Sequence, residues 1–469
     1  MQRLRAIFLT CALASLACAA DYTALDRYIA APDSSYRYTL AGTVSMSGLV
    51  AYQIDLVSQT WLTTAEVDKP VWHHWMTVYK PDQLTTSTVV LFIDGGSNTA
   101  SPPSPDTSMM FLAASAGAVV VDLGQVPNEP LTFAGESQPR TEDAIIAYTW
   151  DKYLRTGDER WPARLPMTKA AVRAMDAITD FLAKLPTGSM TVKNFVVGGG
   201  SKRGWTTFSV AEVDPRVSAI APIVFDALNL PSVFENQWRS YGYWAPAVQD
   251  YVAMGIMSWF GTPQMAALQE IEDPFQYRQR LAMPSYQMAS SGDQFFLPDS
   301  PRFFFSDLPG EKYLRFVPNT DHSMSTAATA ANLVGWFRAV SQNSPRPRFY
   351  WDADRTAGTL TVRVVDTPSQ VLLWQASNPT ARDFRLETIG QAWTSTPLSS
   401  TNGVYTATVT ATRGWSAFFV ELTFPGATAD DIPLVFTTEV VVTPDVYPFD
   451  PPPGWGSVAP ARPKAPPHR

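Results

Sequence analysis

The fold is decided by residues 195–205, which read Phe195-Val-Val-Gly-Gly-Gly-Ser-Lys-Arg-Gly-Trp205. A strand-forming run leads into three glycines and Ser201, and a helix is expected to begin directly after the serine. This order predicts a nucleophile elbow, in which the turn excludes bulky neighbours and the serine stands at the positive end of a helix. The usual elbow has glycine two places after the serine, whereas Arg203 stands there and Gly204 follows. The alternative is a glycine-rich turn whose serine only caps the helix.

Strands and helices are predicted to alternate on both sides of this motif. Continuous apolar runs at residues 88–93, 117–122 and 217–224 indicate strands that are covered on both faces, as in a parallel sheet. Helical periodicity occupies residues 141–153 and 167–185. Strands that alternate with helices indicate an α/β domain. Together with the elbow, the pattern predicts an α/β-hydrolase-like domain over residues 21–346.

Three segments depart from this alternation. Residues 227–283 are helical and rich in aromatic side chains, so they form either a cap inserted over the sheet or a buried packing layer. Short alternating strands without intervening helices fill residues 347–447 and predict a small all-β, sandwich-like domain. Residues 448–469 are proline-rich and are expected to be extended or disordered.

The chain has four histidines, and one of them suits a general base. His468 lies in the proline-rich tail, and His73 and His74 lie in a strand-like run that precedes the serine. In α/β-hydrolases the histidine comes last in chain order. His322 follows the last predicted strand on a loop, where an imidazole can reach a serine hydroxyl. We therefore predict that His322 is the base for Ser201.

The acid that orients this histidine is expected between the serine and the histidine in the chain. Asp293 fits this place, because a strand-like segment ends in Ser-Gly-Asp there. Its carboxylate would orient the imidazole and stabilise its cation. Asp226 follows the preceding strand and is a rival. Asp299 and Asp321 are further candidates, for which capping of a turn is the alternative role.

Two groups of backbone donors are candidates for an oxyanion hole. The N–H of Lys202 lies at the start of the predicted helix, and Gly95 and Gly96 follow an early strand with room for a ligand. A plain turn is the alternative for the two glycines. The Gly-Ser-Lys-Arg-Gly turn is also similar to the Gly-Cys-Ser-Arg-x-Gly turn of glucuronoyl esterases, where a basic residue after the nucleophile helps hold the oxyanion. That resemblance implies the same role for the Lys202 charge, and it points toward carbohydrate esters.

Five longer motifs carry a family resemblance. They read Leu91-Phe-Ile-Asp-Gly-Gly-Ser-Asn, Gly200-Ser-Lys-Arg-Gly-Trp-Thr-Thr, Gly292-Asp-Gln-Phe-Phe-Leu-Pro-Asp-Ser, Pro318-Asn-Thr-Asp-His-Ser and Leu373-Trp-Gln-Ala-Ser-Asn-Pro-Thr-Ala-Arg-Asp-Phe-Arg. Over about residues 22–447 the chain resembles the PhoPQ-activated pathogenicity-related protein family, which autocrine proliferation repressor proteins also resemble. The resemblance implies an α/β-hydrolase-like domain and a C-terminal β domain, without an established substrate.

The first 20 residues have the three-part pattern of a secretory signal peptide. A positive start precedes an apolar run and then small residues suited to cleavage. Cys11 and Cys18 are both in this segment, so the cleaved chain has no thiol for a disulfide, a nucleophile or a metal site. We expect a secreted or periplasmic protein. A lipid anchor on Cys18 is the alternative, because Ser15-Leu-Ala-Cys18 resembles a bacterial lipobox.

The composition limits the classes of partner. A net charge of -8 argues against nucleic acid or an anionic membrane surface, both of which need a basic face. No transmembrane segment, metal or organic cofactor is predicted. We expect a secreted serine hydrolase that acts by acyl transfer on an ester or amide of unknown identity. The rival is a catalytically inactive signalling or binding protein on a hydrolase fold, which would dock a protein partner through its C-terminal β domain.

Overall fold

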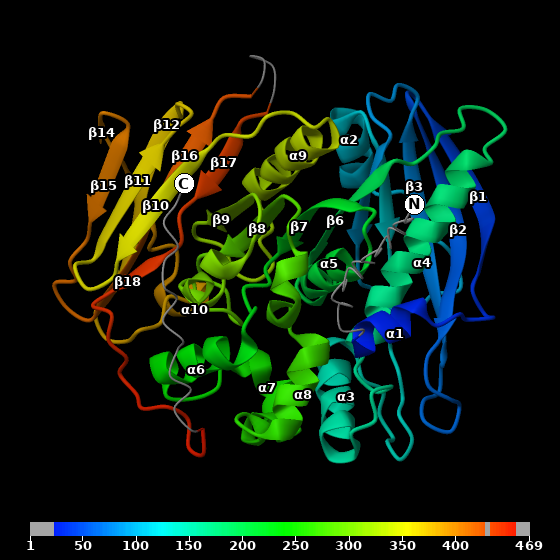
Figure 1. The fold of residues 1–469 in the computed structure, drawn as a ribbon, viewed down its shortest axis with the longest axis horizontal. Coiled ribbons are helices and arrows are strands. Elements are labelled where there is room, and N and C mark those ends of the chain that lie inside the picture. The colour runs from blue at the N-terminus through cyan, green and yellow to red at the C-terminus, as the bar shows by residue number, and fades with distance from the viewer. Residues whose placement is uncertain (1–22, 427–431, 456–469) are drawn as a thin grey trace, which may run out of the picture.

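The computed structural model describes residues 23–426 and 432–455 and is built on one large twisted sheet (Figure 1). Within these residues, fourteen strands form the sheet in the order β1-β2-β3-β5-β4-β6-β7-β8-β9-β17-β16-β12-β13, and β18 pairs with β16. The first nine strands are β1 (Arg37–Met46), β2 (Leu49–Thr60), β3 (Val71–Pro81), β4 (Thr88–Ile93), β5 (Val119–Leu123), β6 (Asn194–Gly200), β7 (Val217–Ile223), β8 (Ser285–Ser290) and β9 (Lys312–Val317).

The middle of the sheet has the predicted α/β organisation. β1, β2, β3 and β5 pair antiparallel, whereas the strands from β5 through β4, β6, β7 and β8 to β9 are parallel. These parallel strands are buried on both faces, which explains their unbroken apolar runs. The helices of this part are α1 (Ala24–Ala30), α2 (Thr107–Ala116), α3 (Glu142–Thr156), α4 (Arg164–Ala183), α5 (Lys202–Val213) and α9 (Ala327–Ser341). Helices α2 and α9 cover one face, and α4 and α5 cover the other.

The C-terminal strands are sandwich-like and share a sheet with the α/β part. Strand β17 (Leu434–Thr437) pairs with β9, so β16 (Trp415–Phe424), β12 (Gln370–Asn378) and β13 (Thr394–Pro397) extend the central sheet. A second sheet packs on this extension through a common apolar cluster. It consists of β10 (Phe349–Asp354), β11 (Thr359–Val364), β15 (Val404–Thr408) and β14 (Ser400–Thr401). The remaining elements here are α10 (Leu386–Ile389) and β18 (Val441–Thr443).

A helical insertion lies between β7 and β8, where the aromatic segment was expected. Its helices are α6 (Leu230–Tyr241), α7 (Gln249–Ala253) and α8 (Pro263–Glu272), with the 3-10 turns η1 (Pro246–Val248), η2 (Ile256–Trp259) and η3 (Pro274–Arg280). Two more 3-10 turns follow β8, at η4 (Ser300–Phe303) and η5 (Phe305–Asp307). Helices α7 and α8 pack against α3, and residues of α6 and α7 line a cavity at Ser201. The insertion therefore acts as a cap whose inner face is also a packing layer.

The described part of the proline-rich tail is packed against this insertion. Phe449 donates its backbone N–H to the Arg239 carbonyl oxygen in α6 at 3.2 Å. Trp455 stacks on Phe260 with ring centroids 4.4 Å apart. The tail through Trp455 is thus held by side-chain contacts, which its proline-rich composition did not predict.

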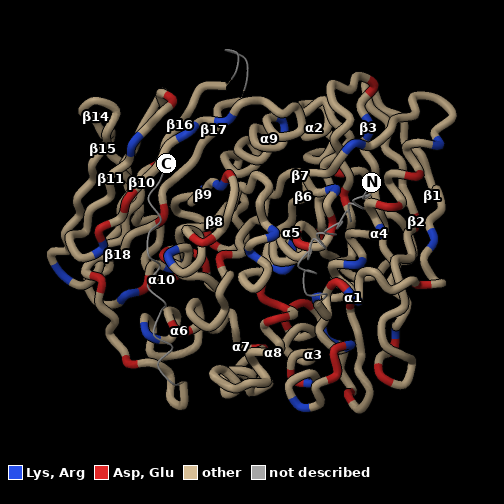
Figure 2. Tube along the Cα trace, viewed as in Figure 1, with Lys and Arg blue, Asp and Glu red and all other residues tan. Residues whose placement is uncertain are grey.

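Several sequence predictions fall outside the described residues. They are the signal peptide at residues 1–20, with Cys11 and Cys18, and the end of the tail, with His468. Among the described residues, no helix combines the length and the hydropathy that crossing a membrane requires. Acidic and basic positions are interspersed along the trace in Figure 2, in keeping with a modest net charge of -8.

Candidate active site

Ser201 lies in the turn between β6 and α5 and has a strained backbone. Its φ is 55° and its ψ is -123°, a conformation that non-glycine residues rarely adopt. Gly204 explains the departure from the usual elbow pattern. A Cβ built on it would lie 2.8 Å from the Ile223 carbonyl oxygen and 3.1 Å from that of Gly199. The first turn of α5 therefore crosses the neighbouring strands at this glycine, and Arg203 is free to carry a side chain.

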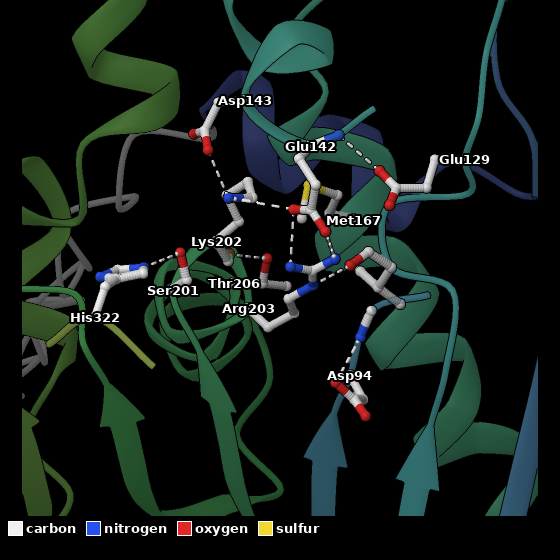
Figure 3. A network of polar contacts seen from close by, with 12 residues as sticks. Asp94, Glu129, Glu142, Asp143, Met167, Ser201, Lys202, Arg203, Thr206 and His322 are labelled. Atoms are coloured by element: carbon white, nitrogen blue, oxygen red, sulfur yellow. Dashed lines mark hydrogen bonds and ion pairs between the residues drawn. The ribbon is translucent and has the colours of Figure 1, made fainter. Parts of the chain in front are cut away.

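The three side chains expected to form the site come together in one hydrogen-bonded chain. His322 Nε2 lies 2.8 Å from Ser201 Oγ (Figure 3), and His322 Nδ1 lies 2.8 Å from Asp293 Oδ2. Asp293 is buried, and its Oδ1 accepts the N–H groups of Phe295 at 2.7 Å and Phe296 at 3.2 Å. An ionised carboxylate can only accept, so it selects the Nδ1–H tautomer. Nε2 is then left as the acceptor for the serine proton.

The three other candidate acids, Asp226, Asp299 and Asp321, lie in surroundings that differ from those of Asp293. Asp226 is buried beside the site, and burial, followed by the nearby charge of Asp293, raises its pKa well above the usual value. Both effects favour the neutral form of Asp226, which suits it less well than Asp293 to balance an imidazolium charge. Asp299 accepts a hydrogen bond from buried Arg382, and Asp321 accepts from the backbone and the hydroxyl of Ser323. These are structural roles.

The other described histidines lie away from Ser201. His74 is fully buried, 2.9 Å from Ser58 Oγ and 3.1 Å from the Gly124 carbonyl oxygen, and burial lowers its pKa to about 4. His73 pairs with Asp55 at 2.8 Å. Among residues 23–426 and 432–455, no group of three His, Cys, Asp or Glu side chains is placed to hold a metal ion.

Lys202 joins an ion-pair network that sequence reasoning missed. Its Nζ lies 2.7 Å from Asp143 Oδ2 and 3.2 Å from Glu142 Oε2 (Figure 3). The Tyr251 hydroxyl donates to Asp143 Oδ1 at 2.9 Å. Both carboxylates begin α3, where acidic residues commonly balance the helix dipole. Their position therefore carried no signal of a role at the site. The Lys202 ammonium is held beside Ser201 by these carboxylates.

Gly95 has a clear reason to be glycine. A Cβ on it would lie 2.2 Å from Arg203 Nη2, and the Arg203 guanidinium makes a two-point ion pair with Glu142 at 2.6 and 2.9 Å. The Gly95 N–H donates to Asp94 Oδ1 at 2.7 Å. Neither Gly95 nor Gly96 lines the cavity at Ser201. The close approach of Arg203 accounts for the first glycine, and the oxyanion role of the two residues stays a prediction.

Buried contacts hold α5 and the aromatic wall in front of it. Arg164, which is fully buried, donates to the Lys202 carbonyl oxygen at 2.9 Å and to Thr206 Oγ1 at 2.7 Å. Its guanidinium also lies 4.0 Å from the centre of the Trp205 ring and pairs with Glu272 at 3.4 Å. These contacts give the helix that carries the elbow little freedom to shift.

The C-terminal β region holds the two loops that carry the acid and the histidine. The Asn319 side chain donates to the Trp393 carbonyl oxygen at 2.9 Å and accepts the Trp393 N–H at 3.0 Å. Leu386 N–H donates to the Gly292 carbonyl oxygen at 3.0 Å, directly before Asp293. The site therefore depends on the segment from α10 to the start of β13, which the sequence assigned to a separate domain.

A cavity of about 40 Å³ opens at Ser201. Its walls are mainly aromatic and aliphatic and come from α3, α5, the helical insertion and the loop after Asp293. The lining residues are Asp143, Trp150, Ser201, Lys202, Trp205, Phe225, Ala227, Leu230, Val233, Phe234, Gln237, Val248, Tyr251, Phe295 and Phe296. A small apolar hollow beside a polarised hydroxyl is suited to one part of a substrate that carries a reactive carbonyl.

Comparison with known sequences assigns the chain to a protein family. The family model of PhoPQ-activated pathogenicity-related protein matches residues 25–385. The chain belongs to this family. A relative from Dictyostelium discoideum, autocrine proliferation repressor protein A, is 40% identical over 466 residues, which cover 93% of this chain and 94% of that protein. The family resemblance seen in the five motifs is confirmed.

Solved structures with similar folds include two acetyl xylan esterases. The one from Paenibacillus sp. is 12% identical with a TM-score of 0.47, covering 68% of this chain and 92% of that chain. The one from Thermoanaerobacterium sp. is 12% identical with a TM-score of 0.45, covering 67% of this chain and 91% of that chain. These identities are too low for either activity to be transferred to this member of the family.

Proposed function

We propose that this protein is a serine hydrolase that cleaves an ester by acyl transfer. The observation that carries the proposal is the hydrogen-bonded chain from Ser201 Oγ through His322 to buried Asp293, with 2.8 Å at each link. A serine hydroxyl is a poor nucleophile without a base, and an imidazole needs a fixed tautomer to act as one. Ser201 has the strained backbone of an elbow and lines the cavity.

The reaction runs in two halves. Ser201 Oγ bonds to the ester carbonyl carbon while His322 Nε2 takes the hydroxyl proton, and the carbonyl oxygen becomes an anion. The backbone N–H of Lys202, at the start of α5, faces that anion, and the Lys202 charge adds to its stabilisation. His322 then returns the proton to the departing alkoxide. Water repeats the sequence on the acyl-serine and releases the acid.

A fluorophosphonate probe tests the proposal directly. We expect covalent labelling at Ser201, located by mass spectrometry of the intact protein and its peptides. Ser201→Ala should lose both labelling and ester turnover while its thermal midpoint stays within a few degrees of wild type. Full ester turnover in that variant would place the reaction at another site.

A second candidate is favoured by the name of the relative from Dictyostelium discoideum, which describes a repressor of proliferation. In this alternative, the chain is an inactive signalling or binding protein, and its C-terminal β region docks a partner. An unreactive Ser201 in protein that melts cooperatively would favour it. We also infer that the protein acts outside the cytoplasm, because residues 1–20 have the pattern of a signal peptide.

A further inference from the structure

The cavity at Ser201 lies on the acyl side of the proposed reaction. The departing oxygen must receive its proton from His322 Nε2, so the alcohol part of an ester faces His322. Ser201 and Lys202 line the cavity, whereas His322 does not, and Figure 3 shows His322 and Lys202 on different sides of Ser201. The substituent that enters the cavity is therefore the acyl chain.

The size of the cavity limits that chain. At about 40 Å³ it is much smaller than the roughly 150 Å³ apolar cavity that holds a benzene ring. An acetyl group places one methyl there, and a butyryl group places three carbons. An octanoyl chain would place seven carbons there, more than a benzene ring has.

The walls are too well packed to move aside for a longer chain. Trp205 stacks on Phe225 with ring centroids 4.8 Å apart, and Trp150 meets Trp205 edge-on at 5.8 Å. All three side chains are buried, and Arg164 covers Trp205 from behind at 4.0 Å. Widening this side would break a close-packed aromatic cluster and a cation–π contact.

The polar groups at the cavity are already engaged with one another. Lys202 pairs with Asp143, which also accepts the Tyr251 hydroxyl. Gln237 donates to the Phe295 carbonyl oxygen and accepts the backbone N–H of Ala245. A charged or strongly polar acyl group would lose its hydration here and would have to displace these partners.

We propose that this cavity is an acyl pocket that selects acetyl and other unbranched aliphatic acyl groups of up to about four carbons. The proposal rests on the proposed function and specifies the substrate class of the same site. Beyond the capacity of an apolar pocket, each added methylene costs about 10-fold or more in kcat/KM. We therefore expect kcat/KM for p-nitrophenyl octanoate to lie at least about 100-fold below the value for the acetate.

Leu230→Ala provides the decisive variant, because Leu230 lines the cavity from α6 and its truncation enlarges the pocket. We expect the octanoate-to-acetate ratio of kcat/KM to rise at least 10-fold. Leu268→Ala is the matched control: Leu268 is equally buried, in α8, but does not line the cavity. That variant should be destabilised to a similar extent and keep the wild-type ratio.

The outcomes separate the two proposals. Equal hydrolysis of acetate and octanoate by the wild type, with Ser201 labelled by the fluorophosphonate, would overturn the acyl pocket and leave the hydrolase standing. So would an unchanged ratio in a folded Leu230→Ala protein. Failure of the wild type to label or to hydrolyse any ester would instead overturn the proposed function, and the acyl pocket with it.

Discussion

Replacing Asp293 with asparagine changes one atom of the candidate site and tests how the histidine is oriented. Asp293 Oδ1 accepts two backbone N–H groups, from Phe295 and Phe296, and Oδ2 faces His322 Nδ1 at 2.8 Å. In the Asp293→Asn protein the two N–H donors hold the amide oxygen in the Oδ1 position. The amide NH₂ then faces Nδ1 and can only donate, so the imidazole proton moves to Nε2. Nε2 can no longer accept the proton of Ser201.

The expected loss follows from this change of tautomer. Neutralising the carboxylate of a serine-hydrolase triad lowers kcat by about 10⁴, and we expect a fall of about 10³ to 10⁴ here. A factor of this size raises the activation free energy by about 4 to 5.5 kcal/mol. Stability should change little, because both backbone hydrogen bonds to the side chain at position 293 are kept.

Asp226→Asn is the control, because the same substitution is made at a buried carboxyl beside the site. Burial and the Asp293 charge raise the pKa of Asp226 well above its usual value, which favours the neutral form of the wild-type group. The amide has almost the same shape as the protonated acid that these surroundings favour, so kcat should stay within about threefold of wild type.

The assay is kcat for p-nitrophenyl acetate at pH 7 to 8, with thermal midpoints to show that both variants are folded. A larger loss in Asp226→Asn than in Asp293→Asn would move the orienting acid to the loop after β7. Retention of most of the activity in Asp293→Asn would also contradict the tautomer argument, whatever the control does.

Three more changes test the surroundings of the site. Lys202→Met should lower kcat at least 10-fold, because it removes a charge beside the oxyanion and leaves Asp143 without its cation; an unchanged kcat in steady-state assays would make Lys202 a structural residue. Asn319→Gly keeps the left-handed backbone and removes both bonds to Trp393, so kcat should fall about 10-fold with KM nearly constant, and equal shifts in both would argue against a positioning role. Burial raises the pKa of Asp122 to about 7, so its stabilising contribution is complete below about pH 4 and is lost as pH rises through 7. The thermal midpoint of Asp122→Asn should therefore rise relative to that of the wild type as pH increases from 4 to 8. A difference in thermal midpoint that does not change with pH would refute the raised pKa of Asp122.

Much of the candidate site could be predicted because its signals are local. The strand–glycine–serine–helix order around Ser201 follows from backbone geometry that only small residues allow. His322 and Asp293 each follow a predicted strand, and parallel strands bring their carboxyl ends to one edge of a sheet. A local pattern with a fixed chain order was therefore enough to select Ser201 and His322 and to favour Asp293, whereas Asp226 stayed open as a rival until the distances decided between them.

What the sequence by itself determined is thus the set of elements and the residues at their ends. Only the tertiary structure decided that the C-terminal strands extend the central sheet through β17, because pairing along a sheet edge depends on partners far apart in the chain. It also decided the partners of Lys202, since Glu142 and Asp143 have the residue types that any helix start favours. The role of Gly95 was also ambiguous from the sequence. A glycine indicates that a side chain would not fit at that position, and only the packing shows that the Arg203 side chain occupies the space.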